Sequence, residues 1–121
     1  MMGEQTLMAL KAAGVDTDGA VARFMGNTAL YERFLRKFPA DPSYGQAVVA
    51  METGELEAVL TAVHTLKGVA GNLGMTRLFD ACTHMLEYIR GDRPEQTRQC
   101  WPDLRQAYED VLKVLTVEGL A

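Results

Sequence analysis

The residues of this sequence best suited to chemistry are a histidine, a lysine and a glycine in close sequence, His64, Lys67 and Gly68. On an α-helix their spacing places all three on one face, about one turn apart. A neutral imidazole nitrogen is a competent nucleophile near neutral pH, because histidine titrates near pH 6.5 in model peptides. The lysine supplies a cation beside it, and the glycine leaves backbone bare for an approaching partner. The pattern therefore makes a nucleophile, a cation and a bare patch of backbone available to a partner.

We expect these residues on a helix over about residues 55–73. One apolar stripe runs along it, of the width expected for a helix that faces a core. The stripe consists of Leu56, Val59, Val63, Leu66, Ala70 and Leu73. His64 falls on the opposite side of the helical wheel, together with Gly68 and Gly71, and Lys67 lies on the flank. His64 is therefore predicted to be exposed and surrounded by small residues.

Two interior glycines, Gly68 and Gly71, weaken this predicted helix by about 0.5–1 kcal/mol each relative to alanine. We interpret them as a surface that a partner must approach closely. The alternative is that they let another helix of the same chain pack tightly. That packing would bury His64 beside a lysine, with no carboxylate in the segment to pair with either.

The run His64-Thr65-Leu66-Lys67-Gly68 resembles the HxxKG signature of histidine-containing phosphotransfer (HPt) domains, in which the histidine carries a phosphoryl group. The resemblance extends upstream over residues 18–38. Downstream it includes Asn72-Leu73-Gly74, Leu78, Cys82 and Leu86-Glu87. It covers about residues 14–91 and shows no departure at the motif positions.

The resemblance implies a carrier in a phosphorelay. His64 would accept a phosphoryl group from the aspartate of a receiver domain, or from a histidine kinase relay, and pass it to another receiver. Lys67 would stabilise the charge of the phosphoryl group, and Gly68 would give the partner access. No Asp or Glu lies between Glu57 and Asp80, so Mg²⁺ and the acidic group are expected on the receiver. The chain itself is predicted to bind no cofactor or metal.

Length predicts one domain over residues 1–121, and helical spacing without strand alternation predicts an all-α fold. A content of 48% apolar and only 7% aromatic residues fits a helical bundle. A formal net charge of −4 argues against a nucleic-acid binder, which usually carries a basic face. No apolar run approaches the roughly 18 residues needed to span a bilayer. The N-terminus lacks the pattern of a signal peptide. We expect a cytoplasmic monomer that binds neither nucleic acid nor membrane.

The helical pattern predicts four segments long enough to pack lengthwise, over about residues 27–38, 55–73, 77–90 and 102–117. Short connections between them favour an up-down-up-down four-helix bundle. The resemblance implies short extra N-terminal helices against the same bundle. Gly74 is expected to close the motif helix, and Pro102 predicts a break or a fresh start in the last helical region.

Other residues are predicted to have structural roles or none. Asn27 or Thr28 should cap a helix, since both side chains can accept a hydrogen bond from a main-chain amide. Cys82 falls on an apolar stripe and is predicted to be a buried thiol rather than half of a disulfide. His84 falls on the exposed side of its helix, where we expect a solvated histidine without function.

Other functions stay open at this point. The same bundle could be a protein-binding adaptor that docks a receiver or kinase without carrying phosphate, although an adaptor needs neither His64 nor Lys67. The chain could also be the phosphotransfer module of a multidomain kinase. An enzyme with its own turnover is not expected, because no glycine-rich nucleotide loop is present.

Overall fold

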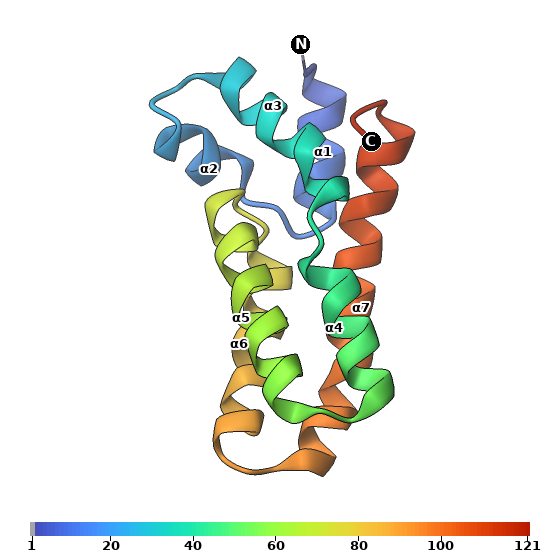
Figure 1. Cartoon of the computed structure of the whole chain (residues 1–121). Coiled ribbons are helices and arrows are strands. Elements are labelled where there is room, and N and C mark those ends of the chain that lie inside the picture. The colour runs from blue at the N-terminus through green and yellow to red at the C-terminus, as the bar shows by residue number, and fades with distance from the viewer. Residues whose placement is uncertain (1) are drawn as a thin grey trace.

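The computed structural model describes residues 2–121, which fold into helices with no strand among them (Figure 1). The all-α prediction is therefore confirmed. The elements are α1 (Glu4–Ala12), α2 (Thr17–Arg23), α3 (Thr28–Lys37), the short 3-10 helix η1 (Phe38–Ala40), α4 (Ser43–Thr53), α5 (Leu56–Asn72), α6 (Thr76–Arg90) and α7 (Pro94–Val117).

The last four α-helices form the bundle. Helix α5 packs against both α4 and α6, and α6 packs against α7. Tyr44 of α4 and Tyr108 of α7 stack with ring centroids 3.7 Å apart, which links the first and last of these helices. In Figure 1 the chain runs down α4, up α5, down α6 and up α7. Helices α1, α2 and α3 lie at the upper end, where α7 finishes.

Two tight turns of the bundle depend on glycine. Gly54 follows α4 with φ 77°, and Gly74 follows α5 with φ 72°. Glycine adopts this left-handed conformation without the steric cost of a Cβ atom. The predicted closure of the motif helix at Gly74 is confirmed. The turns are short, so consecutive helices return alongside each other.

The segment predicted as the first bundle helix, residues 27–38, forms a helix but does not occupy that position. It is α3, which lies over the end of the bundle, and α4 packs beside α5 instead. The reason is local, since Pro39 and Pro42 interrupt the chain between α3 and α4. Helix α4 buries the small side chains Ala47 and Ala50, which permit a close approach to α5.

The predicted break at Pro102 is wrong. Helix α7 runs without interruption from Pro94 to Val117 and contains Pro102. Proline lacks an amide hydrogen, so the main-chain carbonyl of Arg98 one turn earlier loses its helical partner. Both residues are exposed. Water can therefore satisfy that carbonyl, and the buried side chains on the opposite face hold the helix together.

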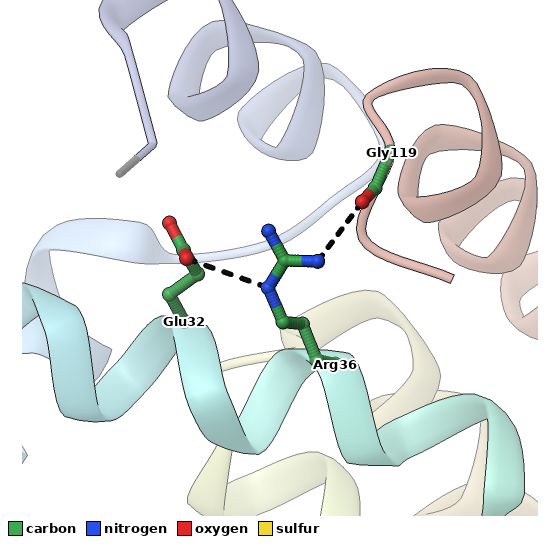
Figure 2. A network of polar contacts seen from close by, with 3 residues as sticks. All are labelled: Glu32, Arg36 and Gly119. Carbon is green, nitrogen blue, oxygen red and sulfur yellow. Dashed lines mark hydrogen bonds and ion pairs between the residues drawn. The ribbon is translucent and has the colours of Figure 1, made fainter.

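Figure 2 shows how the end of the chain is tied to α3. The Arg36 guanidinium lies 3.4 Å from a Glu32 carboxylate oxygen and donates a 3.0 Å hydrogen bond to the carbonyl of Gly119 (Figure 2). The Thr6 hydroxyl donates to a Glu118 carboxylate oxygen at 2.6 Å. These contacts fix the N-terminal helices to the end of α7.

The N-terminal region also anchors the turn after α5. The main-chain amide of Asp16 donates to the carbonyl of Gly74 at 2.7 Å, and the amide of Arg77 donates to the carbonyl of Gly14 at 3.1 Å. Asn27 caps α3, because its side chain accepts a hydrogen bond from the main-chain amide of Leu30. Of the two predicted caps, Asn27 and Thr28, the structure therefore has Asn27. The short helices therefore set where the C-terminal end of α5 lies.

Candidate functional site

His64 lies in the middle of α5 with an exposed side chain, as its place opposite the apolar stripe predicts. The stripe faces the core, where Val59, Val63, Leu66, Ala70 and Leu73 are buried. Among residues 2–121 no hydrogen bond or ion pair holds the imidazole. The ring is therefore available to a molecule that approaches from solvent.

The two glycines near His64 lie in different surroundings. A Cβ atom added at Gly68 would have no heavy atom within 4 Å, so the surface there is open. A Cβ added at Gly71 would lie 3.3 Å from two atoms of the Phe79 ring on α6. The structure leaves open space at Gly68, and the interpretation of Gly68 as a partner surface stays a prediction. At Gly71 the alternative, close packing of another helix, is correct, and it leaves His64 exposed.

The reason for this difference is the position of each glycine around the axis of α5. Gly71 follows Lys67 by four residues, so both lie on the flank of α5 that faces α6, where Phe79 packs. Gly68 lies farther round the helix, on the other side of His64 from that flank, where the surface is open. The helical wheel alone put both residues on the same side, because it contains no information about where α6 crosses.

Lys67 lies on the flank of α5 that faces α6, and its side chain is half-buried. Its ammonium nitrogen is 5.2 Å from the centroid of the Phe79 ring. A cation over an aromatic face at this distance is attracted by the negative face of the ring. Lys67 therefore carries its charge beside His64 and is partly held by α6.

Arg23 brings a second cation to the same end of α5. From α2 its guanidinium donates a 2.8 Å hydrogen bond to the carbonyl of Gly71. A cation suits this position, because the carbonyl groups in the last turn of a helix carry partial negative charge. Sequence reasoning missed both Arg23 and Phe79, since neither lies on α5. The only signal was the short turn at Gly74, which returns α6 alongside the motif.

Cys82 and His84 lie outside this group. Cys82 is a free, fully buried thiol, as predicted. Burial raises the pKa of Cys82 to about 12, and the charge of Lys67 only partly offsets this effect. A thiol that keeps its proton is a poor nucleophile. His84 on α6 is exposed, and no three His, Cys, Asp or Glu side chains of the described chain gather into a metal-binding group.

Comparison with protein families matches the Hpt domain over residues 29–114, from α3 through most of α7, with His64, Lys67 and Gly68 inside the matched range. The match covers well over half of the chain, which therefore belongs to the Hpt domain family. This family acts in histidine phosphotransfer in two-component signalling. No curated protein and no solved structure matches the chain. Within the described residues, no helix has the length and apolar character to cross a membrane.

Proposed function

We propose that this protein is a phosphorelay carrier in which His64 accepts a phosphoryl group from the aspartate of one receiver domain and passes it to another. One observation carries the proposal. His64 is exposed in the middle of α5, with the open surface of Gly68 and the cation of Lys67 about one turn away. Membership of the Hpt domain family supports the same function.

The transfer step needs only a nucleophile and charge stabilisation from this chain. An imidazole nitrogen of His64 attacks the phosphorus of the receiver's acyl phosphate. A nitrogen–phosphorus bond forms as the oxygen–phosphorus bond breaks, the aspartate leaves as a carboxylate, and the proton of the imidazole passes to solvent. Such transition states are loose, so positioning and charge stabilisation matter most. Lys67 is the cation that would approach the phosphoryl oxygens.

The receiver is proposed to supply the metal ion and the acidic groups of the reaction. We place on it the divalent ion, the acidic residues that bind this ion and the aspartate that carries the phosphoryl group. Gly68 leaves space for that partner to close over the phosphoryl group. The chain is proposed to act as a carrier without turnover of its own, because His64 would be the acceptor from one receiver and the donor to the next.

The test is phosphotransfer from a panel of receivers of the same genome, each charged with acetyl phosphate and Mg²⁺. We expect at least one receiver to transfer its label to the wild-type protein and to the matched control His84→Gln. The variant His64→Gln should accept none. Receivers that bind the wild type tightly but transfer nothing would contradict the proposal and identify an adaptor instead.

A further inference from the structure

Phe79 on α6 contacts the motif helix at two positions. Its ring atoms lie 3.3 Å from where a Cβ of Gly71 would be, so the bare backbone of Gly71 makes room for the ring. The ammonium nitrogen of Lys67 lies 5.2 Å from the centroid of the same ring. The Phe79 ring therefore packs against the backbone of Gly71 and contacts the ammonium group of Lys67.

The ring is the partner that the structure gives to Lys67. No carboxylate of the described residues forms an ion pair with this lysine, although ion pairs hold Lys11, Arg36 and Arg77 elsewhere. The attraction between a cation and an aromatic ring is modest at a partly exposed site. The attraction of an ammonium group for a phosphoryl dianion within hydrogen-bond reach is stronger.

We propose that Phe79 is a positioning residue that holds Lys67 against α6 while His64 is unmodified and releases it when His64 carries a phosphoryl group. The spacing of His64 and Lys67 lets the lysine reach either position by side-chain rotation alone. The contact with the ring then stabilises only the unmodified protein, so it opposes phosphorylation slightly. This inference rests on the proposed function of His64.

The first test follows Lys67 by nuclear magnetic resonance, with phosphoramidate as the donor. In this reaction the imidazole nitrogen forms a bond to phosphorus as the donor's own nitrogen–phosphorus bond breaks, and ammonia leaves. We expect the ε-methylene protons of Lys67 to be shifted upfield by the ring in the unmodified protein. The shift should disappear in the phosphorylated protein and in Phe79→Leu, and it should persist in unmodified Phe79→Tyr, which retains the ring.

The second test compares rates of phosphorylation by phosphoramidate. We expect Phe79→Leu to react about threefold faster than wild type, because a contact made only before the reaction is lost. Phe79→Tyr should restore the wild-type rate. In a Lys67→Met background the change Phe79→Leu should have no effect. A merely structural role of Phe79 would affect both backgrounds equally.

The outcomes separate this inference from the function on which it rests. Circular dichroism and thermal melting check that the variants fold, and the Lys67 signal of the wild type needs no variant. A Lys67 shift that stays unchanged when His64 is phosphorylated would overturn the inference and leave the function intact. So would equal effects of Phe79→Leu in both backgrounds. Wild-type protein without phosphate on His64 would overturn both.

Discussion

The hydroxyl of Tyr31 on α3 donates a 2.8 Å hydrogen bond to the main-chain carbonyl of Leu73, the residue that follows α5. Tyr31 is fully buried, and burial raises the pKa of its phenol above the usual value, so the group stays a neutral donor. The bond connects a helix outside the bundle to the end of the helix that carries His64. The N-terminal region therefore contributes to the position of the candidate site.

We predict that Tyr31→Phe lowers the free energy of unfolding by about 1–3 kcal/mol, because the buried carbonyl of Leu73 loses the hydrogen bond that the Tyr31 hydroxyl donates. Urea denaturation monitored by circular dichroism measures the change. Tyr88→Phe is the matched control, since no hydrogen bond of the Tyr88 hydroxyl is present among the described residues. Equal stability of Tyr31→Phe and wild type would show that the bond contributes nothing.

The two glycines of α5 offer a paired test of their surroundings. Gly68→Ala should raise the free energy of unfolding by about 0.5–1 kcal/mol, because it removes an interior glycine at an open position. Gly71→Ala should gain less, or lose stability, since its Cβ would lie 3.3 Å from the Phe79 ring. Calorimetric melting of both variants provides the comparison. A larger gain at Gly71 would contradict the observed packing.

A bulky side chain at Gly68 should separate docking from stability. Gly68→Gln should fold at least as stably as wild type, because glutamine is a better helix former than glycine. It should nevertheless accept phosphate poorly from a receiver and bind it weakly, since the side chain stands on the face that the receiver approaches. Receiver binding and transfer rates test this expectation. A destabilised variant would mean that Gly68 contacts another helix.

Lys67→Ala should slow phosphotransfer to His64 by about tenfold, the effect of losing about 1.4 kcal/mol of transition-state stabilisation. Its free energy of unfolding should fall by no more than about 1 kcal/mol, because the contact with the Phe79 ring is only partly buried. Transfer kinetics and urea denaturation are measured on the same preparation. A variant that melts far below wild type would show that Lys67 is a structural residue.

The raised pKa of Cys82 predicts that the free energy of unfolding decreases at alkaline pH. The thiol has a pKa of about 12 in the folded protein against an ordinary value of 9.0. Between these values the unfolded chain loses the proton and the folded chain keeps it, so this contribution to stability is complete below pH 9 and falls as the pH rises toward 12. The stability difference between wild type and Cys82→Ala should therefore shrink between pH 8 and about pH 10.5. A constant difference would contradict the shift.

Features that depend on local chemistry could be predicted from the sequence. The cap at Asn27 and the end of the motif helix at Gly74 need only a few neighbouring residues, and both were found. The exposure of His64 followed from a single apolar stripe on its own helix. These features do not depend on which other helix lies alongside.

Features that depend on contacts between helices could not be predicted in the same way. Helical spacing identified a helix over residues 27–38 but did not show that α4, which buries Ala47 and Ala50, packs against α5 instead. It also could not place Phe79 against Gly71, since that contact depends on how α6 crosses α5. Pro102 looked like a helix break because the pattern did not show that the affected turn is exposed.

The most direct test of the account is to locate the phosphoryl group after transfer. Mass spectrometry under neutral conditions, together with imidazole resonances of the two histidines, distinguishes His64 from His84. We predict one acid-labile phosphate, bound to a ring nitrogen of His64, which is absent from His64→Gln and retained in His84→Gln. Phosphate on His84, or phosphate that persists in His64→Gln, would contradict the central claim.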